Sequence, residues 1–166
     1  MTIRLATMQD LEQLLAHRLS FIRTLKQGDS TQQPSPGLLT LLSHLEGPTS
    51  QYLEAHLENG TFLAFIAEEN NEIISSCFVC LSEQLPTLKN SSCKEGLILN
   101  VYTLPSYRKQ GLATLLLQEV FKYATTHQIG ALRLSATESG FPLYKKLGFT
   151  LQERDMLWTP SCCSLH

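Results

Sequence analysis

The segment from Val101 to Ala113 constrains the fold and the function of this chain more than any other. It begins as an apolar stretch that stops at Pro105, continues as a short basic turn, and opens a long helical pattern at Gly111. The first N–H groups of a helix have no partner inside the helix, and they lie at the positive end of its dipole. The segment therefore predicts a helix start that binds a phosphate or pyrophosphate.

The residue types in this turn fit such a site. Gly111 lets the backbone approach a ligand closely, Ala113 keeps the first helical turn free of bulk, and Arg108 and Lys109 supply positive charge. A nucleotide P-loop would require G-x-x-x-x-G-K-[ST], and a dinucleotide fold would require G-x-G-x-x-G after a strand. The sequence contains neither pattern. A helix start that binds nothing is the alternative that this segment alone leaves open.

Length and charge narrow the class of protein. The 166 residues suit one domain, and we predict a single domain over residues 1–166. A formal net charge of −2 gives no footprint for nucleic acid. No apolar run approaches the roughly 20 residues that span a bilayer, and the first residues do not resemble a secretory signal. We therefore expect a cytoplasmic protein with no nucleic-acid or membrane partner.

The chain has five cysteines, an odd number that favours free thiols in a reducing compartment. Cys77-x-x-Cys80 is half of a zinc motif, but it lies in a segment that has the pattern of a strand. Residues three apart in a strand point to opposite faces, and no second such pair exists. We predict no metal site.

Periodicity and turn residues predict the order of elements along the chain. Strands are expected at 3–7, 62–67, 72–81, 96–104, 131–136, 149–151 and 154–158. Helical segments are expected at 9–25, 38–45, 48–59, 111–127 and from 139 or 140 to 148, with a mobile loop at 27–37 and a disordered tail at 160–166. This order predicts an α/β (α+β) fold, in which a mixed, mostly antiparallel central sheet is flanked by helices on both faces.

Two motifs of the chain are similar to those of one enzyme family. Arg108-x-x-Gly111-x-Ala113 resembles the acetyl-CoA pyrophosphate loop, R/Q-x-x-G-x-G/A, of the GNAT superfamily of acetyltransferases. About thirty residues later, the stretch from Leu143 to Phe149 resembles the tyrosine-bearing C-terminal motif of the same superfamily. The order of elements also matches the GNAT fold. The resemblance implies an acetyl-CoA-dependent N-acetyltransferase, and it is specific from Leu97 to Phe149.

The resemblance also implies roles for individual residues. Backbone amides would hold the pyrophosphate of coenzyme A, with the Arg108 side chain nearby; they belong to Lys109, Gln110, Gly111, Leu112, Ala113 and Thr114. Backbone groups of Val101, Tyr102 and Thr103 would pair with the pantetheine arm, and the N–H of Val101 or Tyr102 would polarise the acetyl carbonyl. The Tyr144 hydroxyl would protonate the departing thiolate. Thr137 stands where relatives often carry an asparagine.

Several points stay open at this level. The acceptor is expected to be a small-molecule or peptide amine, and the sequence leaves a homodimer open. The general base is not located. The candidates are four carboxylates on or near strands, each typical of a solvated surface group, and three histidines, each typical of a surface or cap position: Glu68, Glu69, Glu83, Glu95, His17, His44 and His56. Relatives often use a chain of water molecules instead. Asn100 within an apolar run suggests a cleft, but its role is unassigned. The alternative function is a catalytically inactive CoA-binding module that acts through protein partners.

Overall fold

The computed structural model describes residues 1–28, 32–88 and 90–152. In these residues the strands are β1 (Thr2–Leu5), β2 (Phe62–Glu69), β3 (Glu72–Glu83), β4 (Lys94–Ile98), β5 (Tyr102–Thr103) and β6 (Ala131–Leu134). The helices are η1 (Met8–Asp10), α1 (Leu11–Gln27), α2 (Pro36–His56), η2 (Pro105–Tyr107), α3 (Leu112–Thr126) and α4 (Phe141–Lys146). The chain divides into two compact units, residues 1–135 and 136–166. The first contains the sheet with α1 to α3, and the second contains α4.

The sheet confirms the predicted fold class. Its strand order is β1-β2-β3-β4-β6, and β5 pairs with β3. The β4–β6 pair is parallel, whereas the other pairs are antiparallel. The β2–β3 hairpin turns at Asn70 and Asn71, whose φ angles are 51° and 63°. Positive φ at both central residues defines the type I′ turn that matches the twist of a hairpin, and asparagine tolerates it.

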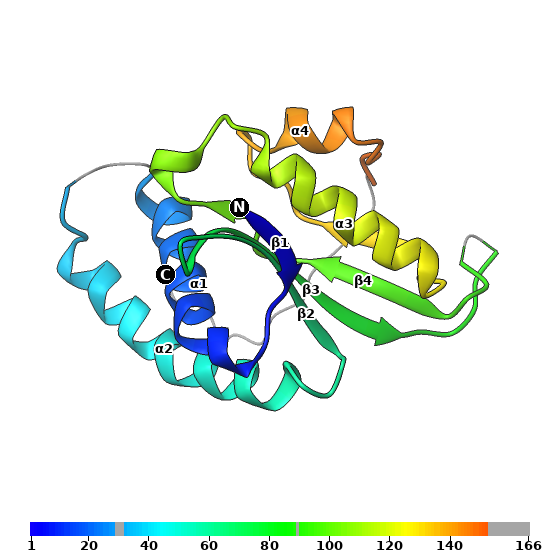
Figure 1. Cartoon of the computed structure of the whole chain (residues 1–166), viewed down its shortest axis with the longest axis horizontal. Helices are drawn as coiled ribbons and strands as arrows, with labels where there is room; N and C mark the ends of the chain where they lie inside the picture. The colour runs from blue at the N-terminus through cyan, green and yellow to red at the C-terminus, as the bar shows by residue number, and fades with distance from the viewer. Residues whose placement is uncertain (29–31, 89, 153–166) are drawn as a thin grey trace. The chain divides into compact units, whose positions relative to one another are not determined.

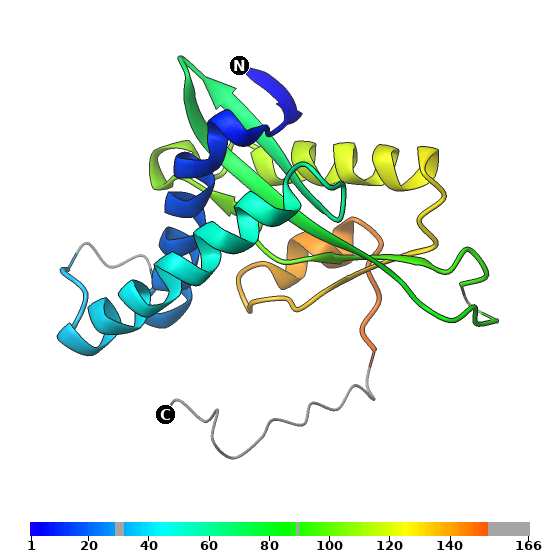
Figure 2. The ribbon, with the colours of Figure 1, turned by 90° about the horizontal axis from the view of Figure 1, so that it is seen from below.

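Helices cover both faces of the sheet. A core cluster on one face combines residues of α1, α2, β2 and β3: Leu14, Leu53, Phe62, Ala64, Ile66, Ile73 and Phe78. Side chains alternate along a strand, so Phe65 of β2 points to the other face. There its ring lies 5.8 Å from that of Tyr123 in α3. The helices α1 and α2 therefore pack on one face and α3 on the other (Figures 1 and 2).

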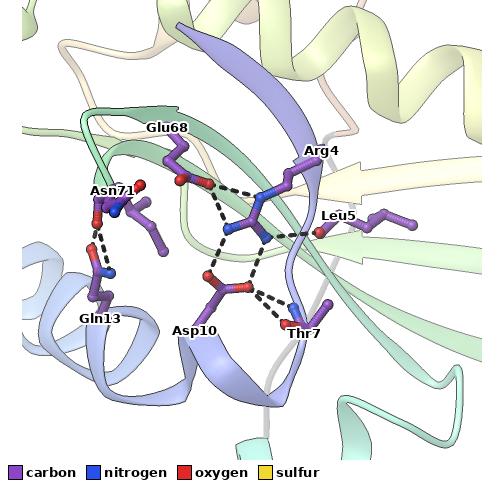
Figure 3. Close-up of polar contacts among 8 residues, drawn as sticks. Arg4, Leu5, Thr7, Asp10, Gln13, Glu68 and Asn71 are labelled. Carbon is purple, nitrogen blue, oxygen red and sulfur yellow. Dashed lines mark hydrogen bonds and ion pairs between the residues drawn. The ribbon is translucent and has the colours of Figure 1, made fainter.

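An ion cluster fixes the first strand (Figure 3). The Arg4 guanidinium donates to both carboxylate oxygens of Asp10, at 2.8 Å each, and its Nε donates to Glu68 at 2.8 Å. Asp10 is 5% exposed, and the Thr7 N–H also donates to it. The hydrogen bonds from Arg4 are the main reason that the pKa of Asp10 falls to about 2. This cluster ties β1, η1 and β2 together.

The structure overturns three details of the predicted elements. Residues 38–45 and 48–59 do not form separate helices, because α2 runs through Pro48. A proline inside a helix has a suitable φ, but it loses its N–H bond and its ring crowds the carbonyl four residues earlier. Packing of α2 against the core outweighs this local cost. The predicted strand 96–104 is divided into β4 and β5.

The third detail is the strand predicted at 149–151, which does not form. The Phe149 N–H donates instead to the Tyr144 carbonyl, at the end of α4. The predicted strand 154–158 and the predicted tail 160–166, which includes the adjacent Cys162 and Cys163, lie outside the described residues.

The two cysteines of the C-x-x-C stretch lie on opposite faces of β3, as predicted. Cys80 packs against the core cluster on the face covered by α1 and α2, whereas Cys77 is fully buried on the other face. Burial raises the pKa of the Cys77 thiol to about 12. No cluster of metal-ligating side chains occurs within the described ranges. Among the same residues, no helix combines the length and the apolarity that a bilayer crossing needs.

Candidate functional site

The start of α3 presents a row of unpaired backbone donors. Gly111 precedes the helix with φ of 83° and Lys109 has φ of 60°, so the turn reaches the helix through two left-handed residues. The N–H groups from Lys109 to Thr114 have no hydrogen-bond partner in the described part of the chain. A Cβ added at Gly111 would meet nothing within 4 Å. Donors at an accessible helix N-terminus suit an anionic group such as a pyrophosphate.

The Arg108 side chain connects this turn to β5. Its Nε donates to the Thr103 carbonyl at 3.0 Å, and its guanidinium carbon lies 5.9 Å from the centre of the Tyr102 ring. The arginine therefore fixes the geometry of the turn as well as contributing charge to it. The structure brings together the residues predicted for the pantetheine arm and those predicted for the pyrophosphate.

A β-bulge separates β4 from β5. Val79 pairs with Ile98 and Ser76 pairs with Tyr102, so three steps along β3 face four steps on the other strand. One extra residue therefore lies between Ile98 and Tyr102. The Leu99 N–H still donates to the Phe78 carbonyl at 2.9 Å, whereas the Val101 N–H has no partner in the described ranges.

The far edge of β5 is not covered by a described strand. The strand β6 pairs with β4 only as far as Ile98 and Leu134, and among the described strands β5 pairs with β3 alone. The Leu104 N–H donates to the Ile74 carbonyl, so the alternation of antiparallel bonds directs the Tyr102 N–H toward β3. The Thr103 N–H then points toward the uncovered edge. An extended ligand arm can pair with this edge as an added strand does.

Three buried polar side chains beside the bulge are linked by hydrogen bonds; we call them the buried polar chain. His17, Ser76 and Asn100 are 5%, 0% and 0% exposed. The Asn100 Nδ2 donates to Ser76 Oγ at 3.4 Å, and the His17 Nδ1 lies 3.0 Å from the same oxygen. The His17 Nε2 lies 2.7 Å from the Ile73 carbonyl, which can only accept, so Nε2 carries the proton. The neutral Nδ1 then accepts from the Ser76 hydroxyl.

These hydrogen bonds explain why the polar Asn100 is buried in an apolar strand, and they make His17 unavailable as the general base. Both ring nitrogens of His17 have partners inside the protein, and burial lowers its pKa. Its ring also meets Tyr102 edge-on, with centroids 5.2 Å apart. The expectation of an ordinary surface or cap histidine was wrong. The sequence signal that we missed is the pair of serines, Ser75 and Ser76, inside an otherwise apolar strand.

We expect His17 to make stability depend on pH. Its folded-state pKa is lower than the 6.5 of the unfolded chain, so the unfolded state binds more protons as the pH falls below about 6.5. As the pH is lowered below 6.5, the free energy of unfolding should therefore decrease, by up to about 1.4 kcal/mol per pH unit. Urea unfolding between pH 8 and pH 5 measures this. His17→Gln should flatten the curve, whereas His44→Gln, at an exposed position of α2, should not. Equal slopes in all three proteins would contradict the assignment.

Two of the carboxylates considered as a general base are held in ion pairs. Glu68 pairs with Arg4, and Glu95, which is 5% exposed, pairs with Arg133. Each of these carboxylates is therefore already engaged by a guanidinium inside the protein. Glu83 is exposed at the end of β3, and Glu69 is half-buried at the end of β2.

Tyr144 belongs to the second unit, residues 136–166. It lies in the last turn of α4, which ends in a Schellman motif: the Phe149 N–H donates to the Tyr144 carbonyl, and the Gly148 N–H donates to the Lys145 carbonyl. The rings of Tyr144 and Phe149 lie 5.8 Å apart and supply the apolar contact of that motif. Thr137 accepts the Gly140 N–H at 3.1 Å, so it stabilises the start of α4. The catalytic role of Tyr144 stays a prediction.

Comparisons with known proteins point to one family. Residues 60–151 match the family model described as an acetyltransferase (GNAT) domain. A predicted acetyltransferase from Clostridium acetobutylicum, solved with acetyl-CoA, is 29% identical, with a TM-score of 0.79 and 95% of each chain covered. A GCN5-related N-acetyltransferase from Ralstonia eutropha is 25% identical, with a TM-score of 0.80 and coverage of 97% of this chain and 98% of that one.

More distant structures share the fold alone. An aminoglycoside N-acetyltransferase solved in complex with CoA is 17% identical, with a TM-score of 0.71 and coverage of 97% of this chain and 95% of the other. No match was found among curated proteins. Because the family model spans more than half of the chain and includes the bulge and the start of α3, this protein belongs to the GNAT family of acetyltransferases.

Proposed function

We propose that this protein is an acetyl-CoA-dependent N-acetyltransferase that transfers the acetyl group directly to an amine. The observation that carries the proposal is the row of unpaired N–H groups from Lys109 to Thr114, directly after a strand with an uncovered edge. A diphosphate and an extended amide-containing arm, joined in one ligand, fit this pair of features. Coenzyme A is such a ligand, and the solved structure of the 29% identical relative holds acetyl-CoA.

In this proposal the bulge is where the chemistry takes place. The pantetheine arm pairs with Val101, Tyr102 and Thr103, and the thioester lies beside the unpaired Val101 N–H. A fixed donor aimed at a developing oxyanion contributes roughly 3–4 kcal/mol to catalysis. Tyr102 is the weaker candidate for this donor, because the strand pairing directs its N–H toward β3.

The proposed reaction is a single displacement through a tetrahedral intermediate. The lone pair of a neutral amine attacks the carbonyl carbon and forms the C–N bond, and the carbonyl electrons move to oxygen. When the carbonyl re-forms, the C–S bond breaks and Tyr144 donates its proton to the thiolate. The surplus proton on nitrogen passes to water, and the Tyr144 phenolate takes a proton back from water to complete the cycle. No covalent enzyme intermediate is needed, and the buried Cys77, with its raised pKa, is unsuited to form one.

Acetyl-CoA should stabilise the folded protein. At 100 times its dissociation constant a ligand adds roughly 2.7 kcal/mol, which corresponds to a rise of about 5–11 °C in Tm for a domain of this size. Coenzyme A should produce a similar rise, since it shares the pyrophosphate and the pantetheine. Differential scanning fluorimetry with acetyl-CoA, coenzyme A, ATP and NAD measures this. A rise with ATP or NAD, but not with either CoA ligand, would refute the assignment.

A measurement of turnover distinguishes the proposed enzyme from a protein that binds CoA without catalysing transfer. Release of free thiol from acetyl-CoA should require an added amine and should produce one acetylated amine per thiol. Mass spectrometry of the product verifies the transfer. Stabilisation by acetyl-CoA without thiol release from any amine would favour the inactive CoA-binding module.

A further inference from the structure

Arg18 of α1 lies beside the bulge, and no carboxylate of the described residues pairs with it. Arg18 is half-buried, and its Nη1 donates to Asn100 Oδ1 at 3.5 Å. Its guanidinium carbon lies 5.9 Å from the centre of the Phe21 ring. No aspartate or glutamate in the described ranges forms an ion pair with it. Burial lowers the pKa of Arg18, and the electrostatic effect of Cys80 partly opposes this.

The buried polar chain fixes Arg18 next to the predicted reaction centre. The Asn100 amide donates to Ser76, so its carbonyl oxygen must face Arg18. Every buried side-chain nitrogen and oxygen in the described residues has a partner. The Arg18 N–H groups without a protein partner are therefore accessible to solvent. Asn100 directly precedes Val101, whose N–H is the proposed oxyanion donor.

A half-buried guanidinium with accessible donors is suited to a carboxylate, which it can bind through two parallel hydrogen bonds. We propose that Arg18 binds the carboxylate of the acceptor, so that the acceptor is an amino acid. This inference rests on the proposed N-acetyltransferase activity and names its substrate class. In an amino acid the carboxylate lies one or two carbons from the amine, which places the nitrogen near the bulge. The same cation repels polycationic amines such as aminoglycosides and polyamines.

Matched acceptors test the proposal in the unmodified protein. Each L-amino acid is compared with its carboxamide, which keeps the amine and the side chain but removes the negative charge. Spermidine and kanamycin represent the polycations. We expect kcat/KM for the best amino acid to exceed that for its carboxamide by about 10²-fold, the effect of one or two charge-assisted hydrogen bonds. Equal use of acid and amide, or a preference for the polycations, would overturn the inference and leave the acetyltransferase function intact.

Variants of Arg18 test whether this residue is the one that binds the acceptor carboxylate. Arg18→Gln should raise KM for the amino acid by about 10²-fold and bring the ratio of acid to amide close to 1. Arg18→Lys keeps the charge without the planar fork, so its loss should be smaller. The matched control is Arg23→Gln on the same helix, where the side chain donates to the Gln32 carbonyl. A stabilisation by coenzyme A equal to that of the parent shows that each variant is folded. An unchanged acid-to-amide ratio in Arg18→Gln would refute the role of Arg18.

A binding measurement keeps the inference separate from catalysis. N-acetylated amino acids, the products of the proposed reaction, are titrated calorimetrically into the CoA-saturated protein and its Arg18→Gln variant. Binding that the variant weakens by about 10²-fold supports the carboxylate site, even if no amine releases thiol. Absence of binding to the parent protein, while coenzyme A still binds, would overturn it.

Discussion

Replacing Tyr144 with phenylalanine is expected to lower kcat and kcat/KM together by about 10²–10⁴-fold, with acetyl-CoA affinity nearly unchanged. The substitution removes only the hydroxyl that we propose as the proton donor to the departing thiolate. The ring, which lies 5.8 Å from that of Phe149 at the end of α4, keeps its packing, so stability should change little. A thiol with a pKa near 8.5 is already a fair leaving group, which favours the low end of this range. Steady-state kinetics with free-thiol detection measures the loss.

Tyr123→Phe is the matched control, because it removes a hydroxyl from a ring that stacks on His127 in α3, away from the bulge. Its turnover should equal that of the parent. If Tyr144→Phe also turns over at the parental rate, the tyrosine serves only the Schellman motif of α4, and another group must donate the proton.

The substitution Gly111→Asp is expected to weaken acetyl-CoA binding by at least about 10²-fold. It places a carboxylate where the unpaired N–H groups of α3 would receive the pyrophosphate, and two like charges 4 Å apart repel by about 4 kcal/mol near a protein surface. A side chain fits at Gly111, because a Cβ there would meet nothing within 4 Å. Isothermal titration calorimetry gives the affinity.

Gly111→Asn is the control that isolates the charge. Asparagine and aspartate have nearly the same shape, and both tolerate the left-handed backbone that the φ of 83° imposes. The two variants therefore share any cost of strain, and they differ only in charge. Equal affinities of Gly111→Asp and Gly111→Asn for acetyl-CoA would show that the start of α3 is not the pyrophosphate site.

Local signals were sufficient for the parts of the fold that depend on neighbours in the chain. The start of α3 was predictable from Pro105, Gly111 and the apolar stripe that follows. Both the left-handed residue and the helical period depend only on residues close together in the sequence. The β2–β3 hairpin was predictable because Asn70 and Asn71 suit a turn with two positive φ angles. The family resemblance predicted acetyl-CoA as the ligand of this helix start; the family match shows the GNAT family, and the ligand site stays a prediction.

Features that depend on distant partners were beyond the sequence. Residues 96–104 have the pattern of one continuous strand, and only their pairing with β3 reveals the extra residue between Ile98 and Tyr102. The strand predicted at 149–151 does not form, because the Phe149 N–H donates to the Tyr144 carbonyl at the end of α4. The sequence pattern predicts a helix start at Pro48, but core packing carries α2 through this residue.

The sequence by itself determined the order of elements, the donor-rich start of α3 and the family, because periodicity, glycine and proline act on the backbone within a few residues. Only the tertiary structure decided the bulge and the polar chain that supports it. His17, Ser76 and Asn100 come from three distant segments, and each would be unfavourable alone in a core. A buried polar group is stable only when its partner is present, and that partner is set by the packing of α1 on β3 and β5.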